Sequence, residues 1–432
     1  MSESDDPKLR SRRRFLASAA TAAAVAATAP VAAAAHGRAA TSSSSSSSES
    51  GGDREPFFGL HQAGVATMPQ ANVYFAAFDL TTEKRVDVVA LLRAWTAASA
   101  RLAQGLSAVA LTDDPASPEP DSYDAAGLNA DRLTLTFGFG PGMFTKDGKD
   151  RYGLAKHRPE ALADLPRFNG DQLAPARTGG DLCIQACADN PQVAFHAVRQ
   201  LSRLAYGTAN IRWAQSGFMA APKDKSTPRN LMGFKDGSMN VPIRDEASMN
   251  RYVWAGDESG WMQHGTYMVA RPIRIALEHW DRMKLSFQEQ VVGRQKHSGA
   301  PLGQKNENDS LALDTNDASG NPIIPENAHV RLGAPENNDG AQILRRAYSY
   351  DNGLSYIAER WPPWHQGMEF DAGLLFICYQ RDPRTGFVKI FDKMSKFDMM
   401  NQFVTHVGGG LFACPPGVKE GGYIGQPLFE LA

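Results

Sequence analysis

The chain has 432 residues, enough for two domains with full cores. Hydrophobic residues make up 42% and charged residues 21%, an ordinary composition for a globular protein. The 45 basic and 47 acidic residues nearly balance, which argues against nucleic acid or another polyanion as a partner.

The first 35 residues have the form of an export signal. Residues 11–16, SRRRFL, are typical of the twin-arginine pathway, an alanine-rich stretch follows, and Ala33 and Ala35 have the spacing of a cleavage site. The alternative, an amphipathic or membrane-spanning helix, is disfavoured because the stretch is mostly alanine and contains Pro30. We therefore expect residues 1–35 to be a signal peptide read by the twin-arginine export machinery, and the mature protein to be periplasmic, extracellular or in the cell envelope.

Residues 36–55 are expected to be a flexible linker. They include seven consecutive serines, residues 42–48, followed by more serine and glycine. Such a composition cannot bury a core. Folding is expected to begin near Phe57.

Residues 56–245 show the pattern of a ferredoxin-like domain. Apolar runs and period-two alternation predict strands at 73–80, 133–140, 181–188 and 209–219. Helical patterns follow the first strand, from residue 86 to 106, and the third, from Asn190-Pro191 to about residue 206. The resulting order is βαββαβ.

Residues 246–432 repeat this pattern with one insertion. Strands are predicted at 266–280, at 373–380 and in the terminal run GLFACPPG, with helices up to about residue 292 and at 395–404. Residues 293–341 are polar and rich in Asn, Gly and Pro, which predicts an irregular segment, and a loop of this length is usually functional. The expected fold class is α+β, with two ferredoxin-like βαββαβ halves whose antiparallel sheets are flanked by helices.

The four cysteines indicate neither covalent haem attachment nor a zinc site. None belongs to a Cys-x-x-Cys-His motif. In the strand-like run 181–188, Cys183 and Cys187 share a face with Gln185, and further zinc ligands at suitable spacing are missing from the sequence. We expect these two cysteines to be buried apolar residues.

The stretch Gly233-Phe234-Lys235-Asp236-Gly237 places one carboxylate between two glycines. Glycine tolerates positive φ and permits close approach of another group to the main chain. The loop can therefore press against a flat ligand and direct its acid over it. The same residues also fit a plain turn, because Asp-Gly is a common turn dipeptide.

Two later motifs favour a site over a turn. His329-Val330-Arg331 and the run ILRRAYSY at 343–350 follow in order. Together the three motifs resemble those of the dye-decolorizing peroxidases, a family of haem enzymes. The resemblance extends from about Phe57 to Pro416, and it is greatest to the branch of exported deferrochelatase/peroxidases of bacterial iron uptake.

This resemblance implies a non-covalent haem b held between the insertion and the glycine-flanked loop. It implies His329 as the axial ligand of the haem iron. Ligating histidines usually donate their second nitrogen to a carboxylate or carbonyl, and Asp398 is the candidate partner. Backbone contacts to the haem are implied for Gly237, Ser238 and Met239.

Asp236 and Arg345 are the implied catalytic residues. A carboxylate near the open iron face can accept a proton from hydrogen peroxide and return it to the outer oxygen as the O–O bond breaks. An ordinary aspartate stays ionised in mild acid, where a histidine is already charged. Arg345, also an expected haem contact, can donate to both peroxide oxygens, whereas Arg346 would point elsewhere in a strand. The alternative makes both arginines surface ion-pair partners.

Two further positions concern the haem propionates. Arg331 is implied as the charge-assisted partner of one propionate. The family often has Asn-Pro-Arg shortly afterwards, but this chain has Ala334-Pro335-Glu336. A glutamate cannot pair with a propionate, so that anchor is in doubt.

Aromatic side chains are candidates for carrying electrons from a bulky donor to a buried haem, although most are expected to be packing residues. The candidates are Trp254, Trp261, Tyr348, Tyr350, Trp361 and Trp364.

The leading hypothesis is a haem b peroxidase that reduces hydrogen peroxide and oxidises aromatic or dye-type donors in one-electron steps. The alternatives are a deferrochelatase, which releases iron from haem, and a non-catalytic exported haem-binding protein. Plain haem binding needs no acid and cation over the open iron face, which favours an enzyme. Iron-uptake partners and a homo-oligomer are left open.

Overall fold

The computed structural model describes residues 53–220, 222, 226–358 and 366–431. The expected signal peptide, most of the expected linker, Trp361 and Trp364 lie outside the described residues. Residues 50–432 form one compact unit, and the domain boundary expected at residue 245 stays a prediction. Among the described helices, none has both the length and the apolar character needed to cross a bilayer.

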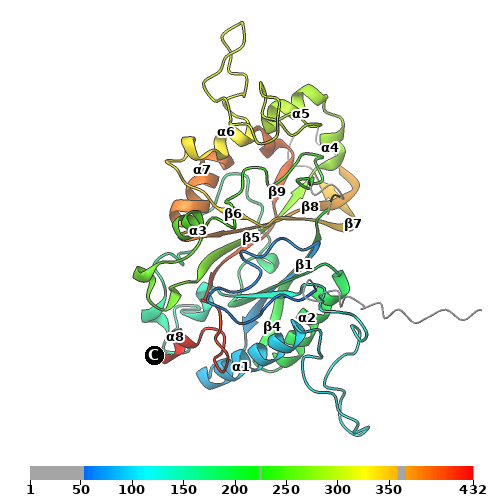
Figure 1. Cartoon of the computed structure of the whole chain (residues 1–432), viewed down its shortest axis with the longest axis vertical. Coiled ribbons are helices and arrows are strands. Elements are labelled where there is room, and N and C mark those ends of the chain that lie inside the picture. Colours follow the sequence, from blue (N-terminus) through cyan, green and yellow to red (C-terminus); the bar gives the residue numbers. More distant parts are fainter. Residues whose placement is uncertain (1–52, 221, 223–225, 359–365, 432) are drawn as a thin grey trace, which may run out of the picture. The chain divides into compact units, whose positions relative to one another are not determined.

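The N-terminal half has the expected order of strands and helices (Figure 1). Its elements are β1 (Asn72–Leu80), α1 (Arg85–Leu102), β2 (Thr134–Phe139), β3 (Leu182–Ala188), α2 (Pro191–Leu204) and β4 (Ala209–Phe218). The strands are antiparallel in the order β4-β1-β3-β2. Helix α2 begins where the sequence indicates, because the Asn190 side chain accepts from the N–H of Gln192 and Pro191 occupies the first turn.

The C-terminal half repeats this arrangement. Its elements are β5 (Thr266–Ile275), α4 (Leu277–Asp281), α5 (Leu285–Val292), β6 (Leu344–Arg345), β7 (Tyr348–Ala358), β8 (Gln366–Gln380), α7 (Lys389–Phe397), β9 (Val404–His406) and β10 (Gly410–Cys414). The order β10-β5-β8-β7 matches that of the first half, which confirms the α+β class. Helix α3 (Glu246–Tyr252) lies between the halves, α6 (His329–Gly333) belongs to the insertion, and α8 (Gln426–Glu430) is the last element.

The two halves share one continuous sheet. Phe218 of β4 pairs with Ser349 of β7, and Phe139 of β2 pairs with Ala413 of β10. The strands therefore run β6-β8-β7-β4-β1-β3-β2-β10-β5-β9, and pairing between β8 and β5 closes the sheet on itself. The sheets expected for the two halves are thus joined, and the join satisfies edge strands that would otherwise be unpaired.

The sequence prediction differs from the structure in several elements of the second half. Strand β7 is absent from the predicted strands, and β8 begins at Gln366, before the expected start at residue 373. The strand expected at 266–280 ends at Ile275, because α4 begins at Leu277. The helix expected at 395–404 is wrong: α7 ends at Phe397, a 3₁₀ turn (Met399–Gln402) follows, and β9 has no counterpart in the prediction. Asp398 ends the helix, since its backbone is extended and its side chain caps the new turn at the N–H of Met400.

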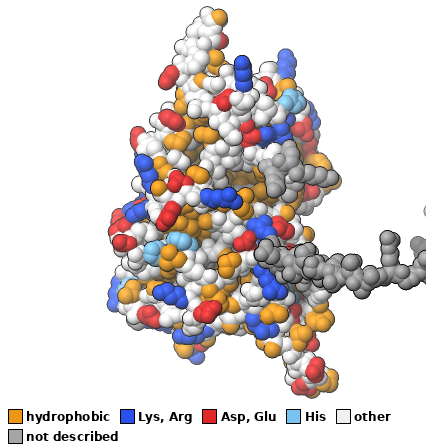
Figure 2. Space-filling view, viewed as in Figure 1, with side chains coloured by type: hydrophobic (Ala, Val, Ile, Leu, Met, Phe, Trp, Pro, Cys, Tyr) orange, Lys and Arg blue, Asp and Glu red, His pale blue; other side chains and the backbone are white. Residues whose placement is uncertain are grey.

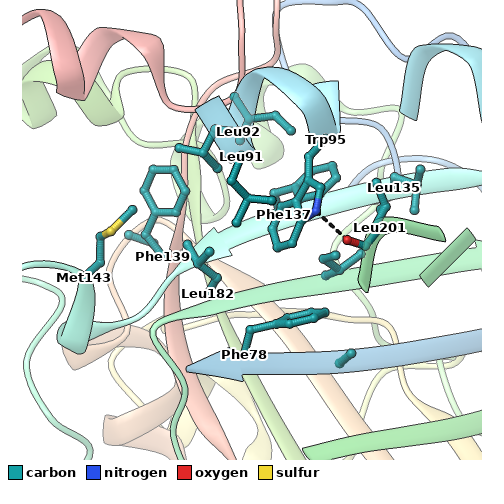
Figure 3. Close-up of a cluster of buried hydrophobic side chains, with 14 of the residues drawn as sticks. Phe78, Leu91, Leu92, Trp95, Leu135, Phe137, Phe139, Met143, Leu182 and Leu201 are labelled. Carbon is teal, nitrogen blue, oxygen red and sulfur yellow. Dashed lines mark hydrogen bonds between the residues drawn. The ribbon is translucent and has the colours of Figure 1, made fainter. Parts of the chain in front are cut away.

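Helices α1 and α2 cover the outer face of the N-terminal strands, where they bury an aromatic core (Figure 3). The Trp95 ring lies 5.4 Å from Phe78 and 5.7 Å from Phe137, measured between ring centroids. Its indole N–H donates to the carbonyl of Leu201 at 2.8 Å, which joins α1 to α2. Burying each such ring contributes about 1.5–3 kcal/mol, so this core stabilises the N-terminal strands and their two helices.

The opposite face of the strands points into the closed sheet and carries a second buried cluster. It includes Cys183, Cys187 and Cys414, while Cys378 packs in the outer core. All four cysteines are buried and free. The prediction that Cys183 and Cys187 are buried apolar residues is confirmed.

The insertion is largely irregular, as expected, and Glu307 attaches it to the glycine-flanked loop. Ser238 Oγ donates to Glu307 Oε1 at 2.7 Å, and Lys235 Nζ pairs with Oε2 of the same carboxylate. The buried Arg294 donates to the main-chain carbonyl of Glu307 at 2.9 Å. One glutamate thereby holds the insertion against the loop that carries Asp236.

This attachment predicts a pH-dependent contribution to stability. Burial raises the pKa of Glu307, but hydrogen bonds from Lys235, Thr227 and Ser238 outweigh it and hold the pKa below the ordinary 4.5. A carboxylate whose pKa is lowered by folding contributes fully to the free energy of unfolding when the pH is above its pKa in the unfolded state. This contribution is lost as the pH falls through the pKa of the folded state. We therefore expect Glu307→Gln to melt below the wild type at pH 7, with a difference that shrinks as the pH falls below 4.5.

Differential scanning calorimetry from neutral to acidic pH measures this difference. Glu326→Gln is the matched control, because Glu326 is an exposed glutamate of the same insertion and should melt like the wild type. A Glu307→Gln difference that does not change with pH would contradict the prediction.

Candidate active site

Asp236 and Arg345, which are 109 residues apart, form an ion pair. Arg345 Nη1 donates to Asp236 Oδ1 at 2.9 Å. The Arg345 and Asp236 side chains are 29% and 22% exposed, so both retain access to a small molecule. The structure thus brings together the two residues that the motifs assign to the distal side.

The loop that carries Asp236 is a tight turn that needs glycine. The N–H of Gly233 donates to the carbonyl of Asn230 at 2.9 Å. Gly233 has φ +84°, a backbone conformation that residues with a Cβ rarely adopt, so a substitution there would be strained. The N–H of Asp236 donates to the carbonyl of Pro228 at 2.9 Å. The main chain from which the carboxylate projects is therefore fixed.

Arg345 is the last residue of the short strand β6, where it pairs with Cys378 of β8. Successive strand residues face opposite sides of a sheet. Arg345 accordingly faces Asp236, whereas Arg346 is buried inside the closed sheet and donates to the carbonyl of Thr67 and to Gln70. The prediction that Arg346 points elsewhere is confirmed, and the alternative of a surface ion pair is wrong for it.

His329 begins α6, and Asp398 orients its ring. His329 Nδ1 lies 2.7 Å from Asp398 Oδ2. The Asp398 side chain is only 3% exposed, whereas that of His329 is 36% exposed. With its proton on Nδ1, the imidazole donates to the carboxylate and keeps the Nε2 lone pair for a metal. Asp398 is thus the hydrogen-bond partner that the sequence suggested.

The break after α7 places Asp398 at this ring. Asp398 Oδ1 accepts from the N–H of Met400 at 2.8 Å, which leaves Oδ2 for His329. The N–H of Met399 donates to the carbonyl of Asn327 at 3.1 Å, and this ties the turn to the residues just before the histidine. The helix end that the sequence misplaced is therefore part of the site.

The loop that carries Asp236 and the helix α6 that carries His329 border one apolar cluster. Phe234 of the loop belongs to it, and Val330, next to His329, packs against it. Its other buried members are Met232, Ile275, Trp280, Val291, Val292 and Phe403. Apolar walls, an imidazole on one side and an acid–guanidinium pair contributed by another segment fit a haem and its reaction partner.

The other predicted haem contacts have varied surroundings. Gly237 has φ +120°, which favours glycine. Met239 is exposed, and Ser238 is engaged by Glu307. Their contacts with haem stay predictions.

Arg331 is engaged in holding the insertion. Its Nε donates to the carbonyl of Ile324 at 2.9 Å, and its Nη2 donates to the carbonyl of Leu313. Glu336, the departure from the family pattern, is exposed. The propionate contact of Arg331 also stays a prediction.

The described aromatic candidates pack against neighbours. Trp254 stacks on His61 with ring centroids 3.8 Å apart, and Trp261 lies 6.2 Å from Phe139. Tyr348 and Tyr350 are buried inside the closed sheet. Packing explains all four, and an electron-carrying role stays a prediction.

Sequence reasoning missed three residues around the distal pair. Asn240 bonds to the main chain of Arg345, and Glu307 holds the loop. Arg294 has a pKa lowered mainly by burial and in addition by the charge of Arg345, while Glu307 raises it. Only Asn240 gave a local signal, because it follows Asp236 in the same loop; the other two belong to the insertion.

Models of both domains of one family match this chain. The Dyp-type peroxidase N-terminal model matches residues 62–219, and the C-terminal model matches residues 227–419. A dye-decolorizing peroxidase of Thermobifida fusca is 38% identical over 386 residues, which cover 85% of this chain and 84% of the relative. A deferrochelatase of Escherichia coli K12 is 34% identical over 390 residues, covering 88% of each chain.

Solved structures agree with this assignment. Ferric DtpA from Streptomyces lividans has 38% identity and a TM-score of 0.78, covering 87% of this chain and 97% of that one. A DyP-type peroxidase from Cellulomonas bogoriensis has 37% identity and a TM-score of 0.77, covering 88% and 99%. The chain therefore belongs to the Dyp-type peroxidase family, whose members are haem b enzymes that reduce hydrogen peroxide at the expense of an organic donor.

Proposed function

We propose that Asp236, Arg345 and His329 carry the peroxidase reaction of this protein. Family membership makes the chain a haem b peroxidase that uses hydrogen peroxide and an organic donor. The ion pair between Asp236 and Arg345 is the observation that supports the residue assignment. Dye-type and phenolic aromatics are the proposed donors.

The distal residues divide the work between proton transfer and charge stabilisation. Asp236 Oδ1 is bonded to Arg345, whereas Oδ2 has only a long contact of 3.5 Å with Asn230 Nδ2. Within the described part of the chain Oδ2 is thus the less engaged oxygen, and we assign to it the transfer of a proton from peroxide to the outer oxygen. Arg345 retains further N–H donors, which stabilise the negative charge that develops on the peroxide oxygens.

The proximal residues hold the cofactor. Haem supplies the redox-active iron and an open coordination position. His329 Nε2 is the proposed ligand, and the buried Asp398 carboxylate orients the ring and increases its basicity. Arg331 Nη1 makes no hydrogen bond within the described part of the chain, and we assign it to a propionate, with Gly237, Ser238 and Met239 as backbone contacts.

Iron release from haem is the second candidate function. It is supported by the 34% identical relative that is named a deferrochelatase. The test is fluorescence of free protoporphyrin after haem is added without peroxide. Protoporphyrin formed in stoichiometric amounts supports the activity, and unchanged haem rules it out.

We also propose that the protein is exported by the twin-arginine machinery to the periplasm, the cell envelope or the medium, where iron-uptake proteins are its candidate partners. Residues 11–16 support this proposal.

Self-association of the protein is supported by two exposed apolar cross-strand pairs of β7 and β8, Leu354–Phe370 and Tyr356–Met368. A monomeric mass by light scattering would contradict a homo-oligomer.

Replacing the distal residues should slow the peroxide step without loss of haem. We expect Asp236→Asn to lower the rate constant for peroxide by about 10²–10⁴, because the amide cannot take the proton. Arg345→Leu should lower the same rate constant by about 10²–10³, because no guanidinium then donates hydrogen bonds to the negatively charged peroxide oxygens. Stopped-flow absorbance of the haem-loaded variants measures both.

Asp317→Asn, which changes an exposed aspartate of the insertion, is the control and should react like the wild type. Wild-type rates in both distal variants would overturn the assignment.

Replacing the proximal residues should weaken haem binding instead. We expect His329→Ala to lose the haem absorption band of the wild type, and Asp398→Asn to lower haem affinity by about 10–100-fold because the imidazole loses its anionic partner. Titration of the apoprotein with haem measures the affinity. An unchanged haem spectrum in His329→Ala would exclude this histidine as the ligand.

Conservative changes in the signal should block export. We expect Arg12→Lys together with Arg13→Lys to leave the folded protein in the cytoplasm, because the pathway reads the arginine pair. Cell fractionation followed by immunoblotting measures its location. Export at the wild-type level would show that another signal is used.

A further inference from the structure

One side chain of the distal loop holds the main chain of Arg345 from two sides. The N–H of Arg345 donates to Asn240 Oδ1 at 2.8 Å, and Asn240 Nδ2 donates to the carbonyl of Arg345 at 2.7 Å. Asn240 belongs to the same loop as Asp236, and its own N–H donates to the carbonyl of Gly237 at 3.2 Å. The asparagine therefore links the segment that carries the acid to the strand that carries the guanidinium.

The position of Arg345 in the sheet explains why this link matters. Strand β6 comprises only Leu344 and Arg345, and among the described strands it pairs with β8 alone. An amide side chain offers one acceptor and donors, as a neighbouring strand would. Asn240 thus supplies the hydrogen bonds that a second strand would make to Arg345.

The ion pair cannot hold Arg345 throughout the reaction. When the guanidinium donates to peroxide, and when Asp236 Oδ2 takes a proton, the attraction between the two side chains weakens. The bonds to Asn240 involve the main chain of Arg345, so they persist through those events. A misplacement of about 1 Å can cost a hundredfold in rate, which makes a fixed main chain valuable.

We propose that Asn240 is a positioning residue for the peroxide step: it fixes the main chain of Arg345 so that the guanidinium faces both Asp236 and the peroxide. Asn240 acts through Arg345, and the inference rests on the proposed role of that arginine.

The test uses the haem-loaded full chain with Asn240→Leu, which has a similar size and no hydrogen-bonding groups. We expect the rate constant for peroxide to fall at least about tenfold. Fluoride is a second probe, because an anion on the open iron face is stabilised by the same guanidinium, and its affinity should fall in parallel. The haem absorption spectrum and the rate of donor oxidation should match those of the wild type.

Asn240→Asp is the second variant if the leucine protein folds poorly. It keeps an acceptor for the N–H of Arg345 and loses the donor to the carbonyl, so it should also lower both quantities. Asn190→Ala is the matched control. Asn190 also bonds to the main chain, since it caps α2 by accepting from the N–H of Gln192, but it belongs to a helix outside the loop of Asp236 and the strand of Arg345. It should lower the melting temperature and leave the peroxide rate and fluoride affinity unchanged.

The outcomes separate this inference from the proposed function. If Arg345→Leu slows the peroxide step while both Asn240 variants react and bind fluoride like the wild type, the positioning role is overturned and the catalytic assignment stands. If Arg345→Leu itself reacts at the wild-type rate, the assignment of the arginine fails. A parallel loss in the Asn240 and Arg345 variants, with an unchanged Asn190 control, supports both.

Discussion

The site depends on holding a carboxylate and a guanidinium, Asp236 and Arg345, together in a partly exposed place. Ion pairs with this degree of exposure contribute little to stability, so the pair does not hold itself in place. Its surroundings do this instead: the turn at Gly233 aims the acid, and pairing of β6 with β8 and with Asn240 fixes the arginine. The main chains that carry the two residues are therefore held independently of the ion pair itself.

Helices of the two halves lie at different ends of the closed sheet. In the N-terminal half, α1 and α2 bury an aromatic core against the strands, whereas α4, α5, α6 and α7 gather at the other end of the unit (Figure 1). His329 and Asp398 lie in that second group, on α6 and just after α7. On the face in Figure 2, basic and acidic side chains are interspersed, in keeping with the balanced composition and with a small molecule as the substrate.

Two charged side chains of the insertion, Arg331 and Glu336, have different surroundings. Glu336 is exposed, and two side-chain nitrogens of Arg331 donate to main-chain carbonyls of the insertion. The described contacts thus tie Arg331 to the insertion and His329 to Asp398, next to an apolar cluster. Relatives named for peroxidase and for deferrochelatase activity are both similar to this chain, and they share the fold on which either chemistry is built.

The sequence by itself determined what depends on near neighbours. Apolar periodicity located β1, β3 and β10, a capping asparagine and a proline located α2, and spaced motifs singled out Asp236, His329 and Arg345. Only the tertiary structure decided the joined sheet, the end of α7 at Phe397, and the contacts of Asn240 and Glu307. It also confirmed the contact between Asp398 and His329 that the sequence suggested. Periodicity and capping act within a few residues, whereas these contacts join segments brought together by sheet closure and by the path of the insertion, which no local pattern encodes.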